Sequence, residues 1–117
     1  MPRVLLIEDD EDLRLALAGT LALSGYEVSE ASEGEGALKA ATDRNPDVIV
    51  TDIVMDGMEG ISAIMALRAR FGTIPIVAIS GNPFYLRNSE KLGADAALLK
   101  PFRREVLLDT IDKLLNG

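Results

Sequence analysis

The chain has 117 residues, of which 48% are hydrophobic and 26% charged, a composition typical of one globular domain with its own core. The net charge of −7 argues against direct binding to nucleic acid or to anionic membranes, because both need clusters of Lys and Arg. Cysteine and histidine are absent, which excludes disulfides, thiolate nucleophiles, histidine-based triads and most zinc sites. Any chemistry must therefore use carboxylates, hydroxyls, Lys, Arg and backbone groups.

The sequence contains no evident targeting or membrane segment. Its first apolar run, residues 4–7, is too short for a signal peptide, and no stretch is long enough to span a membrane. We therefore expect a cytoplasmic protein. Because no linker or repeat appears and the last helical pattern ends near the last residue, we expect residues 1–117 to form one domain without an effector domain, which either stands alone or was cut from a longer protein.

Predicted strands and helices alternate along the chain. Apolar runs rich in β-branched residues predict five strands, at residues 3–7, 26–31, 47–52, 74–80 and 96–99. Apolar residues at helical spacing predict five helices, at residues 10–24, 33–44, 59–71, 84–92 and 103–115. Nearly continuous apolar strands joined by short connections predict a single doubly wound α/β domain, with helices on both faces of a five-stranded parallel sheet.

Helical spacing also predicts which side chains face the core. In the first helix, the inward positions are Leu13, Ala16, Leu17 and Leu21. In the third and fifth helices, they are Ile61, Ile64, Met65, Leu67, Val106, Leu107, Ile111, Leu114 and Leu115. The opposite side of the first helix is uncharged after Arg14 and carries Leu15, Ala18, Gly19 and Ala22. This outer face is either an alanine-rich surface without a role or a docking surface for a partner helix.

Polar groups collect where the predicted strands end. The first strand runs into five acids in "VLLIEDDEDLR", beginning with Glu8 and Asp9. The third strand ends at Asp52, the fourth at Ser80, and Lys100 follows the fifth. In open parallel sheets the active groups gather at these carboxyl ends. Taken singly, each residue also has an ordinary explanation as a helix cap, a turn residue or a solvated Lys, but four strand ends together favour a site.

The charges of this cluster point to a hard cation. Three carboxylates, from Glu8, Asp9 and Asp52, sum to −3, and one Mg²⁺ together with Lys100 brings the sum to zero. Oxygen ligands without His or Cys are those that Mg²⁺ prefers. A site balanced in this way can admit a phosphoryl group, because a metal ion and an ammonium group can both contact its oxygens.

In order and spacing, these residues resemble the receiver domain of two-component response regulators. The matching positions are Glu8, Asp9, Asp52, Ser80, Lys100 and Pro101, with Gly60 eight residues after Asp52. The resemblance covers essentially the whole chain. It implies a flavodoxin-like fold with strand order 2-1-3-4-5.

The resemblance also implies a role for each site residue. Asp52 would be the nucleophile that accepts a phosphoryl group from a phosphohistidine of a sensor histidine kinase or histidine phosphotransfer protein. Mg²⁺ or Mn²⁺ would be held by Asp9, Asp52 and the backbone carbonyl of Val54, with Glu8 holding metal-bound water. Lys100 would pair with the acyl phosphate, and the Ser80 hydroxyl would bond a phosphoryl oxygen. The Lys100-Pro101 peptide bond would be cis.

On this interpretation the protein is not an enzyme beyond its own phosphorylation and slow dephosphorylation, and it switches conformation to regulate a downstream partner. Dimerisation, if it occurs, is expected to be weak or to depend on phosphorylation. Two positions depart from the family pattern: Asp56 stands where Pro is usual, and Ala97 where Tyr or Phe is common. Because Ala97 has no side-chain rotamer to switch, we expect any relay to run through the loop after Ser80.

Three alternatives belong to other classes. A phosphatase of the haloacid dehalogenase type also uses a strand-end Asp, but it needs a second acid two residues later, where this chain has Val54. A flavodoxin-like cofactor binder would need a phosphate-binding loop after the first strand, where Glu8 and Asp9 would repel a phosphate. A receiver-like domain that only binds partners would not need the acids, Asp52, Ser80 and Lys100.

Overall fold

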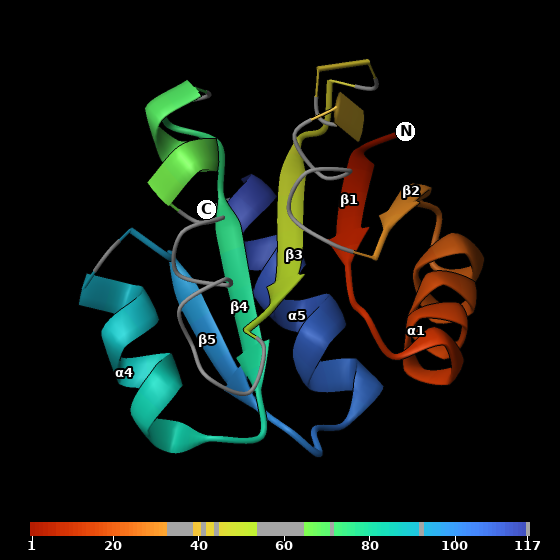
Figure 1. Cartoon of the computed structure of the whole chain (residues 1–117). Coiled ribbons are helices and arrows are strands. Elements are labelled where there is room, and N and C mark those ends of the chain that lie inside the picture. Colours follow the sequence, from red (N-terminus) through yellow and green to blue (C-terminus); the bar gives the residue numbers. More distant parts are fainter. Residues whose placement is uncertain are drawn as a thin grey trace.

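The computed structural model describes residues 1–32, 39–40, 42–43, 45–53, 65–70, 72–91 and 93–116. Five parallel strands form one sheet in the order β2-β1-β3-β4-β5 (Figure 1). The strands are β1 (Arg3–Ile7), β2 (Glu27–Ala31), β3 (Val48–Asp52), β4 (Ile76–Ser80) and β5 (Ala96–Leu99). The predicted parallel α/β sheet and its strand order are therefore confirmed.

The described helices are α1 (Glu11–Leu23), α4 (Pro83–Lys91) and α5 (Arg104–Asn116). Residues 39–40, 42–43 and 65–70 are also helical, and the rest of the second and third predicted helices lies outside the described residues. Side-chain caps set two of the helix starts, because the first backbone N–H groups of a helix lack partners within it. The Asp10 carboxylate accepts the Leu13 N–H at 3.1 Å, and the Asn82 side-chain oxygen accepts the Phe84 N–H at 2.9 Å.

Two apolar clusters lie on opposite faces of the sheet, because successive side chains of a strand point to opposite faces. One cluster joins α1 and α5 to the sheet and includes Leu6 and Leu107. The other joins α4 and the helical residues 65–70 to the opposite face and includes Leu5 and Leu67. Figure 1 shows α5 behind the sheet and α4 in front of it, near the β5 edge. This arrangement leaves the carboxyl ends of the strands uncovered by these helices.

The predicted spacing of buried helix residues is correct, but the direction in which some of these positions face relative to the sheet is wrong. In α1, Leu17 and Leu21 are buried as predicted, but Ala18 is buried and Ala16 is exposed, the reverse of the prediction. Two residues predicted to face the core are exposed elsewhere: Met65 at 52% and Val106 at 44%. The other described positions predicted inward are buried or partly buried, namely Leu13, Leu67, Leu107, Ile111, Leu114 and Leu115. The predictions at Ile61 and Ile64 lie outside the described residues.

The amino ends of β4 and β5 are held together by Arg68. Its guanidinium donates to the carbonyl oxygens of Ile74, at 2.7 Å, and of Gly93, and to the Asp95 carboxylate at 2.8 Å. Asp95 Oδ2 in turn accepts the Ile76 N–H at 2.8 Å, where β4 begins. Gly93 has a φ of 125°, in the region that favours glycine, and it ends α4 near where the sequence predicts. This network fixes the amino ends of β4 and β5, whereas the polar cluster lies at the carboxyl ends of the strands.

Candidate functional site

Parallel pairing brings the predicted strand-end residues to one edge of the sheet. Asp52, the last residue of β3, pairs with Ile79, and Ser80, the next residue of β4, pairs with Leu99 of β5. The Lys100 N–H then donates to the Ser80 carbonyl oxygen at 2.8 Å. The ladder itself therefore places the ends of β3, β4 and β5 next to one another.

A single ammonium group joins two buried carboxylates at this edge. Lys100 Nζ lies 2.8 Å from Glu8 Oε1 and 2.9 Å from Asp52 Oδ1. Glu8 is 1% exposed and Asp52 9%, whereas a quarter of the Lys100 side chain remains exposed. The Lys100-Pro101 peptide bond is cis, as the family resemblance implies. These contacts join residues that are 92 and 48 positions apart in the sequence.

The acids of the cluster fit a hard divalent cation. Oxygen atoms of Glu8, Asp9 and Asp52 lie within 4.8 Å of one another, and Asp9 is exposed, so solvent reaches the group from its side. Three carboxylates and the Lys100 ammonium leave a net charge of −2 at full ionisation, which a divalent ion would offset. Oxygen donors of this kind suit Mg²⁺ or Mn²⁺. Val54, whose carbonyl is the remaining predicted ligand, lies outside the described residues, as do Asp56 and Gly60.

Burial and hydrogen bonding shift the pKa values of the ionisable groups in the site in different directions. Burial raises the pKa of Glu8 to about 6 and also raises the pKa of Asp52, although Lys100 opposes both shifts. A hydrogen bond with the Glu8 carboxyl lowers the pKa of Asp9. Burial disfavours the Lys100 charge, but its hydrogen bonds to Glu8 and Asp52 outweigh burial and raise the pKa of Lys100. The metal-free site thus carries unfavourable negative charge at neutral pH.

This charge predicts that neutralising Glu8 stabilises the metal-free protein. The folded state holds the Glu8 proton more tightly than the unfolded chain, so stability falls as the pH rises from 4.5 to about 6 and stays low above that. A shift of this size corresponds to about 2 kcal/mol. Glu8→Gln should therefore raise the free energy of unfolding by about 1–2 kcal/mol at about pH 8 in EDTA, and by much less near pH 4.5.

Urea unfolding followed by circular dichroism measures this difference. Glu11→Gln is the matched control, because it makes the same chemical change at an exposed position of the same acidic segment. It should change the free energy of unfolding by less than about 0.5 kcal/mol. A Glu8→Gln protein that is less stable than the wild type at about pH 8 would mean that the ion pair with Lys100 outweighs burial.

Ser80 is buried beside this group at the end of β4. It is 2% exposed, and its Oγ accepts the Asn82 N–H at 3.1 Å, so the hydroxyl hydrogen is left to donate elsewhere. Asn82 is the residue that caps α4, so the Ser80 hydroxyl and the start of α4 share one short loop. The structure therefore places Ser80 on the edge that the sequence predicts and connects it to a helix.

Two contacts of Glu8 were not predicted from the sequence. Its second carboxylate oxygen accepts the Asp10 N–H at 3.1 Å, and its backbone carbonyl accepts from Arg14 Nη1 at 3.0 Å. Nothing in the spacing of these residues predicts the second contact. The sequence does contain one indication of such a contact, because Arg14 is a basic residue that directly follows five acids and one Leu.

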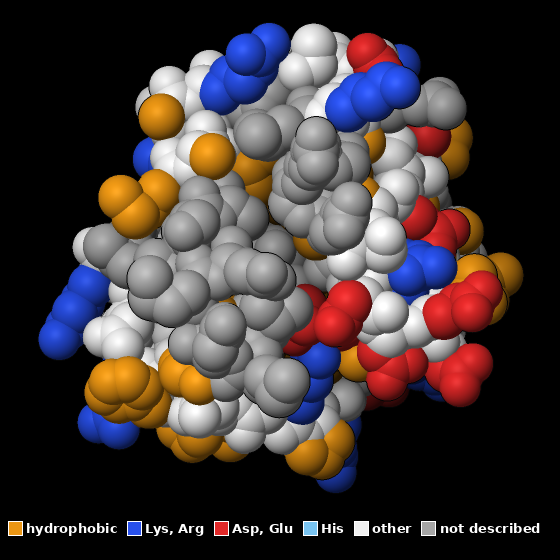
Figure 2. Space-filling view, viewed as in Figure 1, with side chains coloured by type: hydrophobic (Ala, Val, Ile, Leu, Met, Phe, Trp, Pro, Cys, Tyr) orange, Lys and Arg blue, Asp and Glu red, His pale blue; other side chains and the backbone are white. Residues whose placement is uncertain are grey.

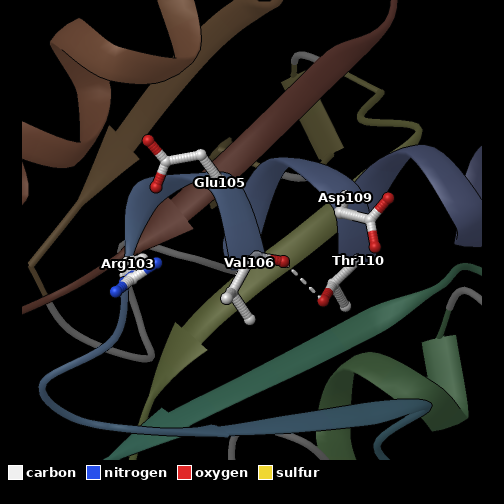
Figure 3. A pocket seen from close by; sticks show the side chains of 5 residues that line it. All are labelled: Arg103, Glu105, Val106, Asp109 and Thr110. Atoms are coloured by element: carbon white, nitrogen blue, oxygen red, sulfur yellow. Dashed lines mark hydrogen bonds between the residues drawn. The ribbon is translucent and has the colours of Figure 1, made fainter.

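The acidic surface near the site and a hollow along α5 lie at different places on the molecule. Figure 2 shows acidic side chains gathered on the side of the molecule where Figure 1 places β2 and the start of α1, with basic side chains among them. A hollow of about 820 Å³ lies instead along α5 and is lined by Arg103, Glu105, Val106, Asp109 and Thr110 (Figure 3). The Thr110 hydroxyl donates to the Val106 carbonyl at 2.7 Å within the helix. This hollow contains none of the predicted site residues.

Curated relatives of the chain are regulatory proteins about twice its length. Transcriptional regulatory protein PrrA of Mycobacterium tuberculosis is 40% identical over 117 residues, which cover 98% of this chain and 50% of PrrA. Transcriptional regulatory protein AfsQ1 of Streptomyces coelicolor is 34% identical over 114 residues, covering 92% of this chain and 48% of AfsQ1. The chain thus spans about half the length of these relatives.

Solved structures match the fold over nearly the whole chain. Chemotaxis protein CheY4 of Vibrio cholerae has a TM-score of 0.89 at 33% identity, covering 98% of this chain and 99% of that protein. The receiver domain of NtrX from Brucella abortus has a TM-score of 0.91 at 27% identity, covering 97% and 98%. Among the described residues, no helix is both long and apolar enough to cross a bilayer.

The family follows from the sequence as well as from the fold. The sequence model of the response regulator receiver domain matches residues 4–112, a span that includes every predicted site residue. The chain belongs to the response regulator receiver domain family.

Proposed function

We propose that this chain accepts a phosphoryl group on Asp52 from a phosphohistidine of a sensor histidine kinase or histidine phosphotransfer protein, in a reaction that depends on Mg²⁺ or Mn²⁺. The observation that carries this proposal is the Asp52 carboxylate itself. It lies at the carboxyl end of a central strand, 9% exposed, with Oδ1 bonded to Lys100 and its oxygens near those of Glu8 and Asp9. A carboxylate in this setting needs no general base to act as a nucleophile.

The residues of the site divide the work of the transfer. An Asp52 oxygen attacks phosphorus while the P–N bond of the phosphohistidine breaks, and the electron pair of that bond stays on the imidazole nitrogen. Asp9, Asp52 and the Val54 carbonyl would hold the metal ion, and Glu8 its water; when bound, the ion offsets charge on the phosphoryl oxygens. Lys100, already 2.9 Å from Asp52 Oδ1, would neutralise another phosphoryl oxygen. The Ser80 hydroxyl would donate to a third.

Acetyl phosphate tests this function without a partner protein. The chain should gain one phosphoryl group in intact-mass spectra when Mg²⁺ is present and none when EDTA replaces it. No gain with Mg²⁺ from acetyl phosphate, together with none from phosphohistidine donors, would favour a domain that only binds partners. We also expect later dephosphorylation of the chain by itself to be slow.

We further propose that the exposed side of α1 contacts the phosphodonor protein. Leu15 is 54% exposed and adjoins Arg14, whose guanidinium contacts the Glu8 carbonyl, so this part of the helix adjoins the acid cluster. Gly19, one turn further on, is exposed, and a Cβ there would meet nothing within 4 Å. A small residue next to an exposed Leu lets a second helix come close, which is what a helix carrying the phosphohistidine needs.

This contact predicts that Leu15→Asp slows transfer from the cognate phosphohistidine protein by about tenfold, as loss of a central apolar contact does at interfaces. Labelling by acetyl phosphate should be unchanged, because the small donor needs no docking surface. The matched control is Leu23→Asp, at the far end of the same helix and 92% exposed, which should transfer normally. Equal rates for Leu15→Asp and wild type with the protein donor would place docking elsewhere.

Domain extent, cellular location and the response to phosphorylation complete the proposed function. We propose that residues 1–117 form one receiver domain that resides in the cytoplasm and changes conformation on phosphorylation to regulate an effector. Any dimer would be weak or dependent on phosphorylation. The relay would run from Ser80 through the Asn82 cap to α4, because Ala97 offers no switching side chain.

A further inference from the structure

Arg14 holds the backbone of the acid cluster from one side. It is the fourth residue of α1, four residues after the helix cap Asp10. Its Nη1 donates to the Glu8 carbonyl oxygen at 3.0 Å, and its Nε donates to Glu30 Oε1 at 3.2 Å. Only 18% of the Arg14 side chain is exposed, so the side chain as a whole is mostly buried. One planar group thus connects the loop after β1 to the end of β2.

The carbonyl that Arg14 contacts belongs to the peptide unit that carries Asp9. A peptide bond is planar, so the Glu8 C=O and the Asp9 N–H turn as one unit. The other side of Glu8 is already fixed, because its N–H donates to the Ala31 carbonyl at 3.0 Å. Holding the Glu8 carbonyl therefore limits the ψ rotation of Glu8, one of the rotations that would redirect Asp9. Asp9 is itself exposed, so packing does little to orient it.

From these contacts we infer that Arg14 is a positioning residue for the metal site, and that Glu30 orients Arg14. This role rests on the proposed function: the two N–H donors of the Arg14 guanidinium, here called the Arg14 fork, help to set the direction of Asp9 and so raise the affinity for Mg²⁺. Groups hydrogen-bonded directly to metal ligands typically change affinity by about 10- to 100-fold, and Arg14 acts one peptide unit away from Asp9, so we expect an effect at the lower end of that range. The fork requires two separate N–H donors in one plane, which Arg has and Lys lacks.

The sign of the effect separates positioning from charge. Removing a cation near a site for Mg²⁺ would strengthen binding if charge alone mattered. Positioning predicts the opposite: Arg14→Gln should bind Mg²⁺ more weakly by about tenfold. Arg14→Lys keeps the charge but cannot make both contacts, so it should also bind more weakly. A role through charge alone would leave Arg14→Lys unchanged.

The chain offers a matched control at the other end of the same two strands. Arg3 Nε pairs with Glu27 Oε2 at 3.2 Å, the same distance and the same atom types as the Arg14–Glu30 pair. This pair joins the first residues of β1 and β2, at the far edge of the sheet, and it is about half exposed. Arg3→Lys and Arg3→Gln should leave the Mg²⁺ affinity within about twofold of the wild type.

Isothermal titration of Mg²⁺ into the metal-free protein tests the inference, with thermal unfolding as a check on folding. Weaker binding by Arg14→Lys and Arg14→Gln, with normal binding by the Arg3 variants, supports positioning. At saturating Mg²⁺, labelling by acetyl phosphate should return close to the wild-type rate, because the defect lies in metal affinity. If the Arg14 variants fold poorly, Glu30→Ala is the alternative, because it removes the contact that orients Arg14. Glu30→Ala should bind Mg²⁺ more weakly than the wild type, and Glu27→Ala is its matched control.

Two results would overturn the inference. Wild-type affinity in both Arg14 variants would show that the fork does not set the site, and tighter binding by Arg14→Gln with normal binding by Arg14→Lys would show a charge effect alone. A wild-type protein that binds no Mg²⁺ would instead overturn the proposed metal site, and the inference with it. The wild-type titration therefore distinguishes failure of the proposed function from failure of the role given to Arg14.

Discussion

Asp52→Asn is expected to abolish labelling by acetyl phosphate and by any phosphohistidine donor. An amide of the same shape cannot serve as the nucleophile, because its nitrogen and oxygen carry no negative charge at neutral pH. The fold should survive, since Asn keeps an oxygen that can accept the bond from Lys100, now 2.9 Å from Asp52 Oδ1. Intact-mass spectra after incubation with Mg²⁺ and acetyl phosphate give the result directly.

Asp47→Asn is the matched control for this substitution. Asp47 directly precedes the same strand at its other end, where its carboxylate accepts the Arg3 N–H at 2.7 Å. The variant makes the same chemical change and should be labelled as fast as the wild type. Continued labelling of Asp52→Asn would contradict the assignment and would direct attention to Asp9, the exposed acid of the cluster.

Lys100→Met is expected to destabilise the metal-free protein and to slow labelling. Met keeps an apolar stem of similar length but removes the ammonium group that lies between Glu8 and Asp52. Two buried carboxylates would then face each other without a cation, and losing one partner of a buried pair costs about 3–5 kcal/mol. Because a quarter of Lys100 is exposed, we expect about 2–3 kcal/mol in urea unfolding at about pH 8 in EDTA.

Proton and metal binding should each restore the lost stability. As the pH falls, Glu8, whose pKa is already about 6 in the wild type, takes up a proton, so the difference between variant and wild type should shrink. Saturating Mg²⁺ should also shrink it, because the ion supplies positive charge at the same carboxylates. Labelling should remain slow even at saturating Mg²⁺, since the contact that Lys100 would make with the phosphoryl group is missing.

Lys113→Met tests whether any lost ion pair would have this effect. Lys113 Nζ lies 3.0 Å from Asp109 Oδ2, a distance like those of Lys100, but both side chains are more than 60% exposed. Exposed pairs contribute little, so this variant should change the free energy of unfolding by less than about 0.5 kcal/mol. If Lys100→Met were equally harmless, the carboxylates of Glu8 and Asp52 would not depend on Lys100 for their burial.

The site could be predicted from the sequence because the fold is regular. Alternating strands and helices imply a parallel sheet, and in a parallel sheet all strands end at the same edge. Glu8, Asp52, Ser80 and Lys100 each stand at the end of a predicted strand, so local pattern alone places them at one edge of the sheet, and the strand order decides which of them are neighbours. The strand order came from the family resemblance, because spacing along the chain does not determine which strands are neighbours in the sheet.

Rotation and contact distances were decided by the tertiary structure. Helical spacing gives angles between residues but not the direction in which the sheet lies. The pattern therefore predicts Ala16 and Val106 inward and Ala18 outward, whereas the structure exposes Ala16 and Val106 and buries Ala18. The Lys100–Glu8 bond joins residues 92 positions apart, and the Arg14 contact depends on how α1 leaves the sheet. The charges also depend on three-dimensional burial, which raises the pKa of Glu8 to about 6. Local sequence pattern thus indicates which groups gather at one edge of the sheet, whereas the packing of α1, β1 and β5 establishes which atoms of these groups are in contact.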